Sequence, residues 1–378
     1  MNIRRVPLII NGAERFVFCD PDKDTLAQVL RRVGLTGTKV GCNAGLCGAC
    51  SVILDGQVIR SCVKKMKNVP DYAQVVTIEG VGTPFHPHPL QLSWMRFGGV
   101  QCGFCSPGFI VSAKALLDQN PAPTREEVRQ WFQQHHNVCR CTGYKPLVDC
   151  VMEAAKVLRG EEPVEHLHYQ NPEDGDYYGT PIIRPAALAK VCGTCDYGDD
   201  IGLKMPPGTL HLALVQPCVT HHANIKNIDF SEAAAMPGVV KVITAQDVKG
   251  TNLLGGPLGH PRAEVDKATW PVLSDKKIVR WGDVVAVVAA DTRENARAVA
   301  QKVQVELEQL PEYLNFLDAA MPDAIRIHEE GPNIYLRQPL VKGEDPRDLI
   351  PESAHSIQGS FSTTREPHMM LEADTVQG

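Results

Sequence analysis

The 378-residue sequence has no apolar run long enough to span a bilayer, and it has no excess of positive charge. Its 38 Lys and Arg residues are outnumbered by 44 Asp and Glu residues, and no basic face stands out. Membrane insertion and nucleic-acid binding are therefore not expected. The N-terminus has the pattern of a β-strand rather than of a signal peptide. These absences predict a cytoplasmic protein, and the length predicts about two or three domains.

The chain has 13 cysteines, which in the absence of an export signal indicate metal ligation in a reducing compartment rather than disulfides. The first group follows the spacing C-x4-C-x2-C, with glycines between the cysteines and one more cysteine downstream. This is the plant-type pattern for a [2Fe–2S] cluster, in which a tight glycine-containing loop folds around the thiolates. A structural or disulfide role is the alternative. The four candidate ligands are Cys42, Cys47, Cys50 and Cys62.

Around this loop, the apolar pattern predicts a β-grasp ferredoxin-type domain over residues 1–82. Asn11-Gly12 and Asp55-Gly56 are dipeptides that favour the tight turns of β-hairpins. The expected elements are strands over 6–10, 14–18, 51–54, 57–59 and 75–78 and a helix over 26–33 that Gly34 ends. Cys19 lies outside the cluster pattern and is expected to be a buried thiol.

The pattern then becomes helical and predicts a second domain over residues 83–160. Its expected helices are 89–97, 107–117, 125–134 and 146–158. Thr124 is expected to cap the third helix, and Ser106 is expected to cap the second, directly before Pro107. Cys150, on the last helix, is expected to pack in the core.

Two more pairs of cysteines directly precede the second and fourth predicted helices. They are Cys102, Cys105, Cys139 and Cys141. The partial positive charge of helix N-termini would stabilise an anionic cluster between them. Zinc is the alternative, because four cysteines also bind zinc. The combination of C-x2-C with C-x-C, next to a ferredoxin pattern, favours a second [2Fe–2S] cluster.

Residues 161–185 are rich in Pro, Gly, Glu and Asp and are expected to form a linker. Beyond it, two strand–helix–strand units are predicted. Their strands are 210–215, 239–243, 284–289 and 303–307, and their helices are 231–236 and 295–302. A second C-x2-C pattern, with nearby Cys and His residues, suggests a metal site, but packed thiols are the expectation. These residues are Cys192, Cys195, Cys218, His221 and His222.

The cysteine motifs, with their neighbours at 41–50, 101–108 and 139–144, resemble the molybdenum hydroxylase (xanthine oxidase) family. Within it they are most similar to bacterial aldehyde oxidoreductases that use molybdopterin cytosine dinucleotide. Weaker similarity extends through 179–199, 343–345 and 365–372. The resemblance implies an α+β multidomain fold: a β-grasp domain, a four-helix domain, an α/β hammerhead-like domain over 186–320, and over 321–378 a connector with the start of the cofactor-binding domain.

The resemblance also implies an electron path from the molybdenum cofactor through the helical cluster to the ferredoxin-type cluster. By motif, Gln101 and Cys141 would lie nearest the pterin. Xanthine dehydrogenases insert a flavin domain where this chain has only about 25 residues. We therefore expect no FAD and an external electron acceptor such as flavodoxin or ferredoxin.

The segments that complete the molybdenum site in the family, including its glutamate base, have no counterpart before Gly378. The chain is expected to hold two clusters and no catalytic residue, with the remaining molybdenum-binding portion on the same polypeptide or a second chain. The expected assembly oxidises an aldehyde with water to a carboxylic acid, and related enzymes are often homodimers. The alternatives are a non-enzymatic two-cluster carrier or adaptor, a remnant that no longer binds molybdenum, and a hydroxylase of a purine or other N-heterocycle.

Overall fold

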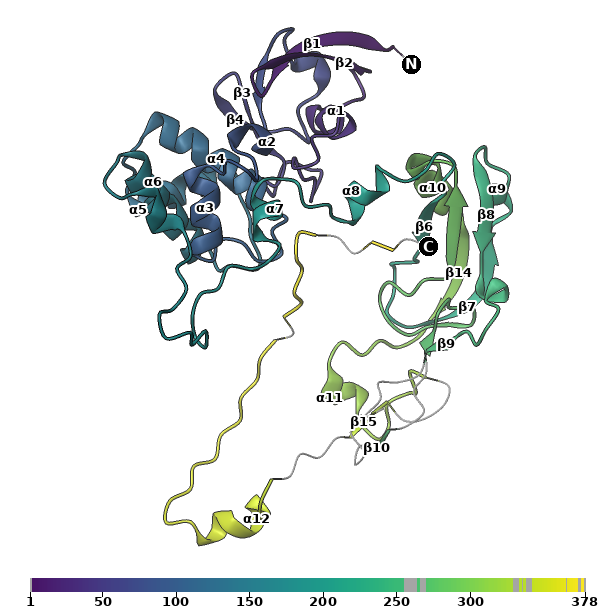
Figure 1. Ribbon diagram of the computed structural model, residues 1–378. Coiled ribbons are helices and arrows are strands. Elements are labelled where there is room, and N and C mark those ends of the chain that lie inside the picture. Colours follow the sequence, from purple (N-terminus) through teal and green to yellow (C-terminus); the bar gives the residue numbers. More distant parts are fainter. Residues whose placement is uncertain are drawn as a thin grey trace. The chain divides into compact units, whose positions relative to one another are not determined.

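The computed structural model describes residues 2–254, 264–265, 270–328, 333–334, 336–337, 342–364, 366–372 and 375–376 (Figure 1). The chain forms two compact units. The first comprises residues 1–205 with 363–378, and the second comprises residues 206–362. Among the described helices, none combines the length and the apolar character needed to cross a membrane.

The first unit begins with a five-stranded sheet in the order β2-β1-β5-β3-β4, in which β1 and β5 run parallel (Figure 1). Its strands are β1 (Arg4–Ile10), β2 (Ala13–Cys19), β3 (Ser51–Leu54), β4 (Gln57–Arg60) and β5 (Gln74–Val76). Asn11 and Gly12 have φ of 51° and 80°, and Asp55 and Gly56 have φ of 47° and 79°. Type I′ turns require positive φ at both central residues, so the two predicted hairpins are confirmed.

Helix α1 (Leu26–Arg32) packs its apolar residues into the core of this sheet, and Thr25 caps its N-terminus. The predicted helix is confirmed. The predicted last strand is too long at its end, because pairing stops at Val76 and helix α2 (Ile78–Val81) follows. The side-chain oxygen of Asn11 accepts a hydrogen bond from the backbone N–H of Thr77 at 2.9 Å. This N–H group therefore does not pair with a neighbouring strand.

Four helices follow, as predicted: α3 (Pro89–Arg96), α4 (Ser106–Gln119), α5 (Arg125–Gln134) and α6 (Lys145–Leu158). Their core contains the aromatic pair Phe109–Phe132, packed edge to face at 4.8 Å between ring centroids. Thr124 caps α5 as predicted. The cap predicted at Ser106 is wrong, because Cys105 already has helical dihedral angles and Ser106 is the first helical residue.

The imidazole of His88 caps α3, with Nδ1 accepting the backbone N–H of Leu90 at 3.2 Å. Burial, together with the Lys114 ammonium, lowers the pKa of His88 to about 4. The unfolded chain therefore binds a proton on this ring more tightly than the folded chain does. Stability from the neutral ring is fully present above about pH 6.5 and is lost towards pH 4, by at most about 3 kcal/mol.

We expect His88→Asn, which keeps a good N-cap, to flatten the decline in the free energy of unfolding between pH 6.5 and 4. Urea titrations across this range measure the effect. His86→Asn is the matched control, because His86 is exposed and caps no helix. An undiminished pH dependence in the His88 variant would rule out the neutral cap.

Residues 186–205, which we expect to open the third domain, belong to the first compact unit by their contacts. Helix α7 (Ala187–Val191) buries Ala187 and Val191 in the helical core, and helix α8 (Gly198–Gly202) buries Asp200. The start of the expected linker is also anchored, because the short helix η2 (Val164–Leu167) buries Leu167. The boundary between the units thus falls after residue 205.

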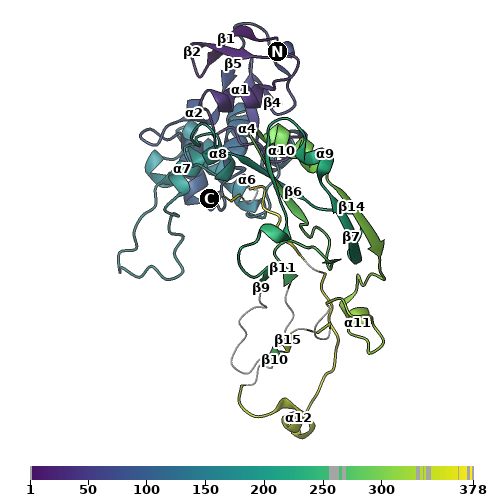
Figure 2. The same cartoon turned by 90° about the vertical axis from the view of Figure 1, so that its right-hand side faces the viewer.

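The second unit contains two three-stranded antiparallel sheets, β6-β13-β8 and β12-β7-β14. Figure 2 labels β6 of the first sheet and β7 and β14 of the second. Their strands are β6 (His211–Val215), β7 (Ala223–Asp229), β8 (Val239–Ile243), β12 (Lys277–Ile278), β13 (Ala286–Ala290) and β14 (Gln304–Gln309). Helix α10 (Arg293–Ala300) packs on β6 and β13, and α9 (Ser231–Ala234) packs on β8. The predicted strands and helices exist, and β6 and β8 of the first predicted unit share a sheet, but the second predicted unit is wrong, because β13 and β14 belong to different sheets. Strand β7 was not predicted.

The remaining elements are short. They are η1 (Met66–Asn68) in the first unit, and η3 (Ala245–Asp247), β9 (Leu253–Leu254), β10 (Glu264–Val265), β11 (Trp270–Pro271), α11 (Phe316–Ala319), β15 (Leu336–Arg337), α12 (Pro346–Leu349) and η4 (Ile350–Glu352) in the second. Of the family-like segment 365–372, Arg365 lies outside the described residues.

Candidate iron–sulfur centres

The first set of candidate ligands is held by the loop 41–50, between α1 and β3, and by the turn after β4. Cys47, Cys50 and Cys62 are buried, whereas Cys42 is exposed. The thiols of Cys42 and Cys47 are hydrogen-bonded to each other, and so are those of Cys50 and Cys62. The fold therefore arranges this set as two pairs.

Backbone N–H groups of the loop point at the sulfurs. The amides of Ala44 and Leu46 donate to Cys42 Sγ at 3.4 and 3.2 Å, and the amide of Cys62 donates to Cys50 Sγ at 3.4 Å. The hydrogen bond from the Cys50 thiol lowers the pKa of Cys62 to about 6, with help from the amide of Gly45. Such donors stabilise sulfur in its anionic, metal-binding form.

At two glycines of the loop, an added side chain would crowd its neighbours. A Cβ on Gly41 would lie 3.3 Å from Cys47 Sγ. A Cβ on Gly48 would lie 2.7 Å from the side-chain nitrogen of Asn137, and the φ of Gly48 is 66°. Glycine at these positions lets the backbone close around the thiols, as a loop that encloses a compact inorganic core requires.

The second set lies at the N-termini of α4 and α6 and is also paired. The thiol of Cys102 is hydrogen-bonded to that of Cys141, and the thiol of Cys105 to that of Cys139. Cys105 and Cys139 are buried, whereas Cys102 and Cys141 are half-buried. The Cys105 thiol lowers the pKa of Cys139 to about 5, assisted by the hydroxyl of Thr142 at 3.1 Å from its sulfur.

The paired arrangement fits a [2Fe–2S] cluster better than zinc. Zinc requires four ligands around one ion. A [2Fe–2S] cluster instead takes two protein ligands on each of two irons. The hydroxyl of Ser106, which is 1% exposed and follows Cys105, has no hydrogen-bond partner among the described residues. A cluster sulfur would give it one.

Gln101 and Cys141 are the residues predicted to lie nearest the pterin, and both are half-buried. Cys141 belongs to the second set, and Gln101 directly precedes Cys102 of that set. The backbone carbonyl of Gln101 accepts a hydrogen bond from Lys190 Nζ at 3.0 Å, which ties this loop to α7. Their contact with a pterin stays a prediction.

The cysteines outside the two sets form no further centre in the part of the chain that is described. Cys19, Cys150 and Cys192 are buried, and Cys150 Sγ donates to the carbonyl of Ser93 at 3.3 Å. Burial raises the pKa of Cys192 to about 11, which suits a packed thiol. Cys218 belongs to the second unit, whereas Cys192 and Cys195 belong to the first.

A buried ion pair beside the two sets was not predicted. Lys39 Nζ lies 2.5 Å from a carboxylate oxygen of Asp200, and each side chain is 1% exposed. Burial lowers the pKa of Lys39, but Asp200 limits that change. Burial alone would raise the pKa of Asp200, yet hydrogen bonds from Lys39 and from the Tyr197 backbone lower it. Nothing in the spacing of these residues, 161 positions apart, signals their contact.

Three family models match the chain in sequence order. A 2Fe-2S iron-sulfur cluster binding domain matches residues 8–74, and a [2Fe-2S] binding domain matches residues 77–152. The a/b hammerhead domain of aldehyde oxidase and xanthine dehydrogenase matches residues 192–311. The predicted fold class, with its β-grasp, helical and hammerhead parts, is confirmed.

The chain is 55% identical over 368 residues to the aldehyde oxidoreductase of Megalodesulfovibrio gigas, covering 97% of this chain and 40% of that protein. The solved structure of the Desulfovibrio gigas aldehyde oxidoreductase matches with a TM-score of 0.88 at 55% identity, over 98% of this chain and 41% of that one. The chain thus spans about 40% of the length of these relatives.

The small FeS subunit of nicotinate dehydrogenase from Eubacterium barkeri is 42% identical over 144 residues. The match covers 38% of this chain and 90% of the subunit. The iron–sulfur part of this chain therefore has a counterpart that is a separate subunit, whereas the hammerhead part aligns with the aldehyde oxidoreductases. The two iron–sulfur domains and the hammerhead that follows them place the chain in the molybdenum hydroxylase family.

Proposed function

We propose that the chain is the iron–sulfur electron-transfer portion of a molybdenum-dependent aldehyde oxidoreductase, which converts an aldehyde and water to a carboxylic acid. The observation that carries the proposal is the two sets of paired thiols within one unit, followed by a hammerhead domain. Aldehyde as the substrate class is supported by 55% identity over 97% of the chain to an aldehyde oxidoreductase.

The pairing suggests which cysteines would share an iron. Cys42 with Cys47, and Cys50 with Cys62, would each bind one iron of the first cluster. In the same way, the second cluster would be held by Cys102 with Cys141 and by Cys105 with Cys139. When bound, the two clusters supply one-electron carriers, and a molybdenum cofactor supplies the two-electron oxidation.

The burial of the ligands gives the proposed path a direction. Cys102 and Cys141, half-buried beside Gln101, would face the pterin of a molybdopterin cytosine dinucleotide cofactor. Cys47 and Phe104 lie in one buried apolar cluster, so the packing between the two sets excludes water. Cys42 is exposed and would be the exit to an external acceptor such as flavodoxin or ferredoxin.

The spacing of the domains supports an assembly without FAD. The helical and hammerhead matches end at residue 152 and begin at residue 192, and the 39 residues between them are fewer than a flavin domain needs. The remaining molybdenum-binding portion would continue from the segment 366–372. Arg140 binds Glu366 at 3.0 Å, and Leu371 packs against the buried cluster that contains Cys47 and Phe104, so this segment reaches the cysteine sets.

Metal analysis of the native assembly, with mass spectrometry of all its chains, tests this proposal. We expect about four irons per chain, molybdenum, and the portion that completes the molybdenum site. Electron paramagnetic resonance (EPR) of the reduced protein should give two distinct [2Fe–2S] signals. Iron without molybdenum, in an assembly of this chain alone, would instead support a two-cluster carrier.

A second candidate is a hydroxylase of an N-heterocycle. It is favoured by the 42% identity of the iron–sulfur part to the nicotinate dehydrogenase small subunit, although that match covers only 38% of the chain. Turnover of the assembly with aldehydes, purines and nicotinate separates the two candidates. Oxidation of nicotinate or a purine without oxidation of any aldehyde would favour the second.

The exposed surface around Cys42 of the first set allows a test of where electrons leave the protein. Leu46 is 62% exposed and its amide binds Cys42 Sγ, so an acceptor that docks there would bury this side chain. Because a buried unpaired carboxylate is costly, Leu46→Glu should slow reduction of the acceptor about tenfold while both clusters are retained. Stopped-flow kinetics with flavodoxin and with ferredoxin measure the rate.

Phe18→Glu is the matched control for this variant. Phe18 is 61% exposed on β2, at the opposite edge of the sheet from β4 and the cysteine turn. Its substitution should leave the rate unchanged. Equal rates for the Leu46 and Phe18 variants would place acceptor docking elsewhere on the molecule.

A further inference from the structure

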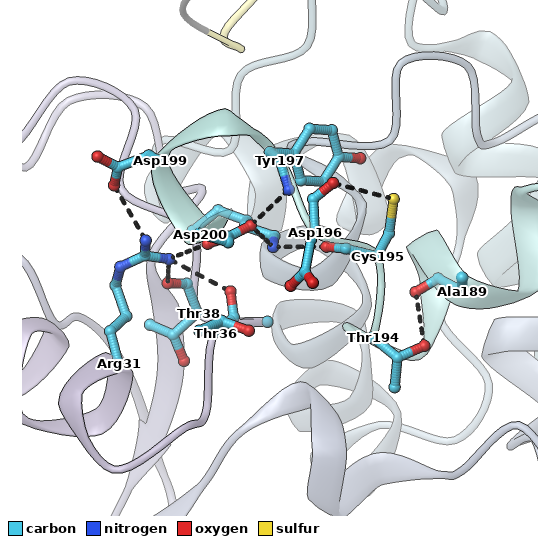
Figure 3. Close-up of polar contacts among 12 residues, drawn as sticks. Arg31, Thr36, Thr38, Ala189, Thr194, Cys195, Asp196, Tyr197, Asp199 and Asp200 are labelled. Atoms are coloured by element: carbon cyan, nitrogen blue, oxygen red, sulfur yellow. Dashed lines mark hydrogen bonds and ion pairs between the residues drawn. The ribbon is translucent and has the colours of Figure 1, made fainter. Parts of the chain in front are cut away.

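The segment 195–200 contacts residues next to both loops that carry the candidate ligands. Figure 3 shows Asp199 and Asp200 facing Arg31, and the Tyr197 backbone bonded to the Asp200 carboxylate. Arg31 belongs to α1 of the β-grasp domain. The segment itself follows α7, which packs on the helical domain. It is therefore tied to both domains at once.

On the β-grasp side, the tie is the buried pair of Lys39 and Asp200. Lys39 lies three residues before Cys42, and its ammonium also donates to the carbonyl of Cys195 at 3.0 Å. Arg31, which is 7% exposed, binds the other oxygen of Asp200 at 2.7 Å. The two cations of this network, Arg31 and Lys39, are balanced by Asp199 and Asp200, but only Asp200 is as well buried as the cations.

On the helical side, the tie is the phenol of Tyr197. Its hydroxyl donates to the backbone carbonyl of Cys102 at 2.7 Å. Its ring packs edge to face on Phe104 at 5.2 Å between centroids, and the Lys39 ammonium lies 4.7 Å from the ring centroid. Tyr197 and Phe104 share a buried cluster with Cys47 of the first set. One side chain therefore contacts a ligand residue of the second set and lies in the same packing as a ligand of the first.

We propose that Tyr197 is a positioning residue for electron exchange between the two clusters: held by the Lys39–Asp200 pair, it fixes the Cys102 loop against the Cys47 loop. The proposal rests on the assignment of the two cysteine sets as [2Fe–2S] ligands. The hydroxyl of Tyr197 offsets the partial negative charge of the Cys102 carbonyl, and the ammonium of Lys39 lies beside the Tyr197 ring in its pair with Asp200. Loss of either positive end would disfavour the more negative, reduced form of a nearby cluster. Neither residue binds iron itself.

Tyr197→Phe tests the inference in the iron-loaded holoprotein, because it removes the hydroxyl and keeps the ring. We expect about four irons and both EPR signals to be retained. The midpoint potential of the cluster on the Cys102 set should become more negative, and the magnetic splitting between the two reduced clusters should change. Tyr169→Phe is the control, since it removes a hydroxyl bonded to Thr180 and belongs to neither set of ligand loops.

The outcomes separate the inference from the proposed function. A wild-type protein without two [2Fe–2S] signals would defeat the proposed function. Two wild-type signals, with Tyr197→Phe equal to the Tyr169 control in both potential and splitting, would overturn the inference alone. If the Tyr197→Phe variant loses iron, the Lys39→Met variant tests the inference in its place. That substitution leaves the hydrogen bond from the Tyr197 hydroxyl to the Cys102 carbonyl in place. A changed splitting and a more negative potential in that variant support the inference, and wild-type values overturn it.

Discussion

Cys105→Ser is expected to lower the iron content from about four to about two atoms per chain and to abolish one of the two EPR signals. Cys105 is buried at the N-terminus of α4 and is paired with Cys139, so no solvent molecule or neighbouring thiol can replace it as a ligand. Serine preserves the shape of the side chain but is a poor ligand for iron in a site built from thiolates. Iron analysis and EPR of the reduced protein measure the result.

Cys150→Ser is the matched control for this substitution. Cys150 is also buried in the same helical core but lies outside both sets, and its thiol donates to the carbonyl of Ser93. A serine hydroxyl keeps that bond, so iron content and both signals should match the wild-type protein. Iron loss in the Cys150 variant, or full iron in the Cys105 variant, would contradict the ligand assignment.

Features of this fold that depend on neighbouring residues were predictable from the sequence. Asn11-Gly12 and Asp55-Gly56 set the hairpins, because few other residues adopt positive φ. Thr124 set the start of α5 through a capping box that spans three positions. The spacing of the eight candidate cysteines likewise carried the cluster prediction without any knowledge of their positions in space.

Features that depend on tertiary contacts were missed. Strand β7 has no clean alternation of apolar and polar residues, since its burial varies with the two strands that flank it. The way the cysteines pair is set by how separate loops meet within each domain. The burial of Lys39 against Asp200 is set by how helix α8 packs on the β-grasp domain. Because a buried lysine is rare, a prediction from residue type alone places Lys39 at the surface.

The largest effect on stability is expected from Asp200→Asn. This change keeps the size of the side chain but removes the only carboxylate that contacts both Lys39 and Arg31 among the contacts described. Two buried cations then lose their principal counter-charge, and breaking a buried pair in this way costs about 3–5 kcal/mol. For a unit of this size the loss corresponds to a fall of about 10 °C in the unfolding midpoint. Loss of cluster absorbance on heating provides the measurement.

Asp199→Asn separates the effect of burial from that of charge, because Asp199 also binds Arg31, at 3.0 Å, but is 41% exposed. Water screens such a pair, so the loss should not exceed about 1 kcal/mol. Adding Lys39→Met to Asp200→Asn should recover part of the lost stability, since the variant then buries one uncompensated cation fewer. Equal losses for the two aspartate variants, or no recovery in the double variant, would mean that the segment 195–200 is held by its apolar contacts. Tyr197 would then reach Cys102 without help from the ion pair.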